Sequence, residues 1–192
     1  MNRVVELIQN KMSVGVFVEN AFPALTTWGV EDQDVMIHSL GVSCWNSLGH
    51  ELGFMAVAEC PIPFSGIAAD DIRSDSVWFD KVKKQPVVIV EFERYDGTEH
   101  GRQKLMEKTE NLLEASNRWG GIPQVLILAA WSSGMVTTPD HHLFTRKIRE
   151  GFKNRKGAMI KGNPEAKFLF SRFFFQAKQG QILLLDRLVF ED

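Results

Sequence analysis

Three carboxylates lie in or at the end of two apolar segments that we expect to be neighbouring strands. Residues 86–94 read PVVIVEFER, so a segment apolar enough to be buried finishes with Glu91 and Glu93. Asp75 lies in the preceding apolar segment, 72–79. A charged side chain is costly to bury unless it is paired or binds a metal, and glutamates at i and i+2 share one side of a strand. The pattern therefore indicates a site that holds a cation.

A hairpin would bring these carboxylates together. The polar stretch 81–85, which reads KVKKQ, is expected to form the loop between the two strands and to place Asp75 beside Glu91. Mg²⁺ prefers oxygen ligands and keeps several waters, so one or two carboxylates suffice to hold it. Mg²⁺ or Mn²⁺ bound there would polarise a phosphate and activate water. Alternatively, Asp75 caps a turn, and the two glutamates lie on an exposed strand end with a salt bridge of small value.

The remaining patterns predict an α/β fold with a mixed central sheet flanked by helices. An apolar segment, a helical segment capped by Thr98, and another apolar segment imply two parallel strands joined by a crossover. An antiparallel hairpin precedes this unit. The helices expected are 1–12, 34–51, 99–119 and one that starts at 138–140, and the strands are 54–60, 72–79, 86–94, 124–131, 167–175 and 182–190.

With these elements in order, residues 34–131 resemble the PD-(D/E)xK nuclease superfamily, which has the restriction-endonuclease-like fold. Ser74-Asp75 stands for the family's "PD", and Glu91-Phe92-Glu93 stands for its "(D/E)xK". The resemblance implies an αβββαβ core, followed here by a C-terminal helix and hairpin. It also implies that Asp75 and Glu91 are the metal ligands and that Glu93, which replaces the motif lysine, adds a ligand or orients the attacking water.

The cation that the motif lysine would supply must come from elsewhere. Arg94 is adjacent but points to the opposite face of its strand, so only a bulge would bring it round. In some families of this fold the cation lies on the following helix. There, Arg102 falls on the expected sheet-facing stripe at the first turn, and Lys108 lies at its margin. We expect Arg102, ahead of Lys108, to stabilise charge on the phosphate, although an arginine on such a stripe more often extends past the core.

Basic residues outside the motif are candidates for phosphate contacts. They are Lys81, Lys83 and Lys84 in the hairpin loop, and Arg146, Lys147, Lys153 and Arg155 in a C-terminal segment that we expect to be a basic helix. Such contacts position a duplex without reading its bases; a solvated helix face is the alternative. The sequence thus favours a metal-dependent DNA endonuclease. An inactive module of the same fold that binds nucleic acid or protein is the alternative, supported by Glu93 and by the formal net charge of −2.

Composition and length limit the number of domains and the cellular location that fit this hypothesis. The chain has 192 residues, of which 44% are hydrophobic and 24% charged, as is typical of one folded domain with a sizeable core. We expect a single domain over 1–192, with an N-terminal extension at 1–33, a core at 34–131 and a C-terminal part at 138–192. No apolar run approaches the ~20 residues that span a bilayer. Cys44 and Cys60 are the only cysteines and neither lies in a CxxC pair, which suits a reducing compartment. We therefore expect a cytoplasmic protein that does not bind membranes. Restriction enzymes of this fold often dimerise, so the resemblance also allows a homodimer.

Three other groups of residues resemble functional motifs, but each has a simpler structural explanation or is incomplete. Asp140-His141-His142 resembles a metal cluster, but the first turn of a helix explains it better. His50-Glu51 lacks the second histidine of a zinc-protease motif. Glu51 shares a helix face with Leu40, where the nuclease family sometimes places an acidic residue, but a solvated helix end is the simpler interpretation.

Overall fold

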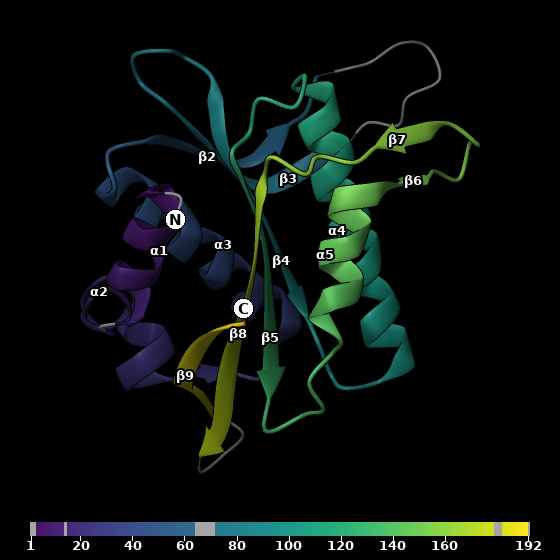
Figure 1. Ribbon diagram of the computed structural model, residues 1–192. Coiled ribbons are helices and arrows are strands. Elements are labelled where there is room, and N and C mark those ends of the chain that lie inside the picture. Colours follow the sequence, from purple (N-terminus) through teal and green to yellow (C-terminus); the bar gives the residue numbers. More distant parts are fainter. Residues whose placement is uncertain (1–2, 14, 64–71, 179–181, 192) are drawn as a thin grey trace.

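A mixed seven-stranded sheet with helices on both faces forms the centre of the molecule (Figure 1). The computed structural model describes residues 3–13, 15–63, 72–178 and 182–191. Its helices are α1 (Arg3–Ser13), α2 (Val16–Ala21), the π-helical turn η1 (Ala24–Trp28), α3 (Asp34–Glu51), α4 (Glu99–Arg118) and α5 (His141–Glu150). Its strands are β1 (Val30–Glu31), β2 (Met55–Pro61), β3 (Arg73–Phe79), β4 (Pro86–Arg94), β5 (Val125–Ser133), β6 (Gly151–Lys153), β7 (Met159–Lys161), β8 (Lys167–Lys178) and β9 (Ile182–Glu191).

The strand order is β1-β9-β8-β5-β4-β3-β2, with β6 and β7 forming a separate ribbon. β3 and β4 are antiparallel neighbours, β4 and β5 are parallel, and α4 provides the crossover, as the sequence predicted. β1 from the N-terminal segment and β8 and β9 from the C-terminal segment extend the same sheet. Within the described ranges, no helix has the length and hydrophobicity needed to cross a membrane.

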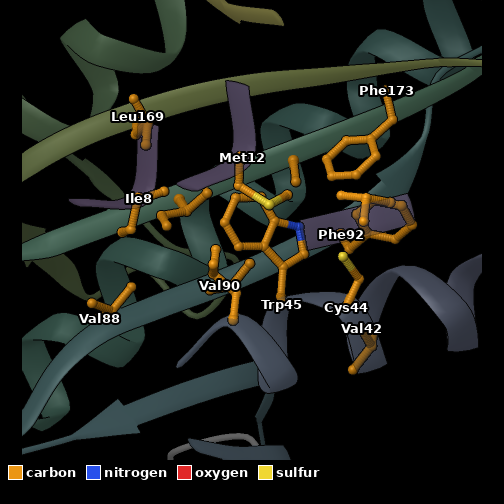
Figure 2. Close-up of a cluster of buried hydrophobic side chains, with 14 of the residues drawn as sticks. Ile8, Met12, Val42, Cys44, Trp45, Val88, Val90, Phe92, Leu169 and Phe173 are labelled. Carbon is orange, nitrogen blue, oxygen red and sulfur yellow. The ribbon is translucent and has the colours of Figure 1, made fainter. Parts of the chain in front are cut away.

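Two hydrophobic layers hold the helices to the sheet. Figure 1 shows α1, α2 and α3 on one face and α4 and α5 on the other. The first layer is built around the buried indole of Trp45, which lies among Met12, Val90 and Phe92 (Figure 2). Phe92 faces this layer, whereas Ile89 faces the second layer beneath α4. Because side chains alternate along a strand, Glu91 faces the α4 side.

The prediction of one basic helix at the C-terminal end, carrying both Lys153 and Arg155, is wrong in its length. Asp140 caps α5 by accepting a hydrogen bond from His142 N–H at 3.1 Å, which confirms that this cluster starts a helix. However, α5 ends at Glu150, because Gly151 adopts a φ of 87°, a conformation that glycine tolerates. Residues 151–161 form the β6–β7 hairpin instead. Lys153 and Arg155 therefore lie on this hairpin rather than on a helix.

Candidate active site

Asp75 lies where β3 separates from β4. The regular pairing of these strands ends at Ser76 and Val90, one step before Asp75 would face Glu91. There, Asp75 Oδ2 accepts the N–H of Phe92 at 2.6 Å. The carboxylate thus occupies the position of a strand carbonyl in the hydrogen-bond ladder. This contact holds a buried charged side chain, 6% exposed, between the two strands.

Glu91 is fully buried, at 0% exposure. One carboxylate oxygen, Oε2, accepts a hydrogen bond from Lys108 Nζ at 2.7 Å. The other, Oε1, is buried without a hydrogen-bond partner in the part of the chain that the structure describes. A buried acceptor without a donor costs about 1–3 kcal/mol, or more when it is charged. The fold therefore tolerates a carboxylate that its own donors do not satisfy.

Lys108 is the cation that reaches both carboxylates. Its Nζ is 2.7 Å from Glu91 Oε2 and 3.4 Å from Asp75 Oδ2. Lys108 comes from the middle of α4, one turn after Leu105, whose side chain is buried against the sheet. Since residues three apart share a helix face, Lys108 projects toward β4 as well. Its side chain is 22% exposed, so part of it contacts solvent.

Arg102 does not take this position, and the expectation that it would reach the carboxylates ahead of Lys108 is wrong. Arg102 Nη2 donates to Glu99 Oε1 at 2.6 Å, within the first turn of α4. The Arg102 side chain is 47% exposed. At the exposed start of α4, Arg102 is held by the carboxylate of Glu99 in the same turn, whereas Lys108 projects from the middle of the helix to Glu91 and Asp75.

His38 completes the cluster, and the sequence analysis missed it. Its Nε2 is 3.6 Å from Asp75 Oδ2. On α3, Met36 is 49% exposed, whereas Gly41, Val42 and Trp45 are buried. His38 precedes these three residues by three, four and seven positions, which is the spacing of one helix face. This spacing in the sequence could have placed His38 on the sheet-facing side of α3.

Close packing of α3 on β4 brings His38 to the site. A Cβ atom at Gly41 would lie 2.1 Å from Cε1 of Phe92, so only glycine allows the helix to approach this closely. Phe92 is the residue whose N–H binds Asp75. The same contact therefore positions the helix that carries His38 and the strand that carries Glu91.

The ionisation of the cluster follows from burial and from these contacts. Burial tends to raise the pKa of Asp75, but His38 and Lys108 outweigh it, and that pKa lies below its usual value. Burial, together with the Asp75 charge, raises the pKa of Glu91 to about 8. Lys108 and, to a smaller extent, the Ser74 hydroxyl favour the charged form of Glu91 and oppose this rise, although Ser74 makes no hydrogen bond to Oε1.

The two basic members respond in the opposite sense. Burial tends to lower the pKa of Lys108, but the carboxylates of Glu91 and Asp75 outweigh that effect and raise it above its usual value. The interaction with Asp75 raises the pKa of His38. Because Lys108 stays protonated, the site carries a positive charge in contact with both acidic side chains, Asp75 and Glu91.

Glu93 lies at the margin of the cluster. It follows Glu91 by two residues, is half-buried, and its Oε1 accepts the N–H of Arg94 at 3.0 Å. Over the ranges that the structure describes, no group of three or more His, Cys, Asp or Glu side chains is arranged to hold a metal ion. A metal would therefore rely on Asp75 and Glu91 with water, a ligand set that suits Mg²⁺. The unpartnered Glu91 Oε1 fits this role.

The basic loop residues lie away from the carboxylates. Lys81, Lys83 and Lys84 are exposed in the loop between β3 and β4. This loop is at the opposite end of β3 from Asp75, and the stretch from Asp75 to Phe79 alone spans about 13 Å. These lysines are not neighbours of the cluster.

The second basic group packs beside α4. Arg155 Nη2 is 2.8 Å from Glu107 Oε1, and Lys147 Nζ is 2.8 Å from Glu110 Oε1. Glu107 immediately precedes Lys108, so the β6–β7 hairpin flanks the helix that supplies the cation. Arg146 and Lys153 are exposed on α5 and β6.

Two other acidic candidates are structural. Glu51 pairs with Lys11 of α1 at 2.8 Å, and Asp140 caps α5. Comparison with protein-family models, with curated proteins and with solved structures found no match to this chain.

Proposed function

We propose that this protein is a divalent-metal-dependent nuclease that hydrolyses DNA phosphodiester bonds, with a restriction-endonuclease-like core. The observation that carries the proposal is the convergence of Asp75, Glu91 and Lys108 from β3, β4 and α4. Two buried carboxylates and one lysine at a strand separation are the components that the PD-(D/E)xK resemblance implies, with the lysine supplied by the helix. The order α3, β2, β3, β4, α4, β5 supports the same proposal.

Asp75 and Glu91 would hold the metal ion. When bound, Mg²⁺ or Mn²⁺ supplies Lewis acidity toward the phosphate and lowers the pKa of a bound water. The Phe92 N–H fixes Asp75, and His38 adds a second contact to the same oxygen. Lys108 lies within reach of the same space and would stabilise negative charge that develops on the phosphate. Glu93 would orient water from the margin.

DNA would be held mainly by the basic residues near α4. Arg155 and Lys153 on the β6–β7 hairpin and Arg146 on α5 are exposed and flank the helix that carries Lys108. Such side chains neutralise phosphates and fix the position of the duplex. Lys81, Lys83 and Lys84 would contact DNA only at a distance from the scissile bond.

A binding module without cleavage is the second candidate. Lys108 already pairs with both acidic side chains through contacts of 2.7 and 3.4 Å, so the cluster contains a cation without a metal. Glu93 stands where the nuclease motif has lysine. A protein of this kind would bind DNA but leave it intact.

Nicking of supercoiled plasmid in Mg²⁺ and in Mn²⁺ tests the proposal. We expect wild-type protein to cleave, and Asp75→Asn and Glu91→Gln to lose at least 100-fold in rate, since each change removes a metal ligand. Asp186→Asn, on the exposed part of β9, is the matched control and should retain activity. Wild-type protein that binds plasmid but cuts it in neither metal would favour the binding module.

A further inference from the structure

Lys108 contacts the same two carboxylates that a metal ion would need. Its Nζ is 2.7 Å from Glu91 Oε2 and 3.4 Å from Asp75 Oδ2, the carboxylates proposed as ligands. A Mg²⁺ ion lies about 2.0–2.1 Å from its oxygen ligands. If the metal ion bound these oxygens while the Lys108 ammonium stayed in hydrogen-bond contact with them, the two cations would be neighbours. Steric overlap and charge repulsion would both oppose this arrangement.

The surroundings of Lys108 allow it to leave. Its side chain is 22% exposed, whereas the Glu91 side chain is completely enclosed. Glu93 lies two residues further along β4, about 6.6 Å from Glu91 along the strand, and is half-buried. An extended lysine side chain pivoting on α4 can cover this distance. Glu93 thus provides a third carboxylate, at the position where the nuclease motif has lysine.

From these contacts we propose that Lys108 is a displaceable internal cation: it holds Asp75 and Glu91 together when no metal is bound, and it moves to Glu93 when a divalent ion enters. This inference rests on the proposed metal-dependent function and extends it to the regulation of metal affinity. The lysine pairs with the proposed ligands, so a metal ion must compete with it. Metal affinity is accordingly lower than the two carboxylates alone would give.

Titration of Mg²⁺ by isothermal calorimetry tests the proposal without any cleavage assay. Lys108→Met should bind Mg²⁺ at least tenfold more tightly than wild type, because the competing charge is gone. Lys108→Arg keeps the charge and should bind no more tightly than wild type. Lys104→Met, one turn earlier on α4, is the matched control. This variant should bind Mg²⁺ with the same affinity as wild type. Equal or weaker binding by Lys108→Met would overturn the proposal.

A second measurement uses wild-type protein and does not depend on how the variants fold. Acetylation of lysine amines, read by mass spectrometry, should increase severalfold at Lys108 when Mg²⁺ is added, relative to Lys104. Unchanged labelling of Lys108 in the presence of bound Mg²⁺ would show that it does not move. If calorimetry detects no Mg²⁺ binding by wild type or any variant, the proposed metal-dependent function fails together with this inference. Binding that is independent of Lys108 refutes the inference alone.

Discussion

Glu91→Gln should change how the stability of the metal-free protein depends on pH. Burial and the Asp75 charge raise the pKa of Glu91 from 4.5 to about 8 in the folded state. The folded protein therefore binds more protons than the unfolded chain between these pH values, and its free energy of unfolding falls as pH rises through this window. Each pKa unit corresponds to about 1.4 kcal/mol, so ionised Glu91 destabilises the wild type by roughly 4 kcal/mol at pH 9 relative to pH 4.

Glutamine has nearly the same shape and does not titrate, so the variant lacks this contribution. The free energy of unfolding of Glu91→Gln, minus that of wild type, should therefore increase by roughly 4 kcal/mol between pH 4 and pH 9. Other groups titrate equally in both proteins and largely cancel in this difference.

Urea denaturation in EDTA, followed by tryptophan fluorescence at several pH values, measures this difference. Asp186→Asn is the control and should follow wild type at every pH. A difference that is flat, or that decreases with pH, would refute the reasoning. It would show that the ion pair with Lys108 outweighs burial and that charged Glu91 stabilises the fold.

Three further predictions concern the surroundings of the site. Gly41→Ala should destabilise the protein by about 1–3 kcal/mol in urea denaturation, since the added methyl group displaces Phe92; Ser39→Ala, at an exposed position of the same helix, is the control and should have little effect. Arg102→Ala should leave plasmid cleavage within about twofold of wild type, because Arg102 pairs with Glu99 in its own helical turn; a large loss of rate would show that Arg102 belongs to the site. Lys153→Ala with Arg155→Ala should reduce the magnitude of the slope of log K against log salt for DNA by about 1–2, measured by fluorescence anisotropy, and an unchanged slope would show that the hairpin does not contact phosphates.

Local patterns were sufficient to predict most of the sheet. Alternation and apolar runs predicted β3, β4 and β5, and the Thr98 cap predicted where α4 begins. These features depend on neighbours in the chain, so the sequence carries them directly. The stop of α5 at Gly151 was also readable in principle, because a glycine followed by an aromatic residue favours a helix end followed by a strand.

The composition of the candidate site was determined only in part by the sequence. Strand parity and the hairpin connection indicated that Asp75 and Glu91 would meet, since both rules act over short distances. The choice between Arg102 and Lys108 required the position of α4 along β4, which depends on packing of the whole helix against the sheet. His38 reaches the site because α3 packs closely against Phe92, and this contact joins residues that are far apart in sequence. Tertiary packing thus decided which cation and which histidine join the carboxylates, because these distances arise from contacts that no local pattern encodes.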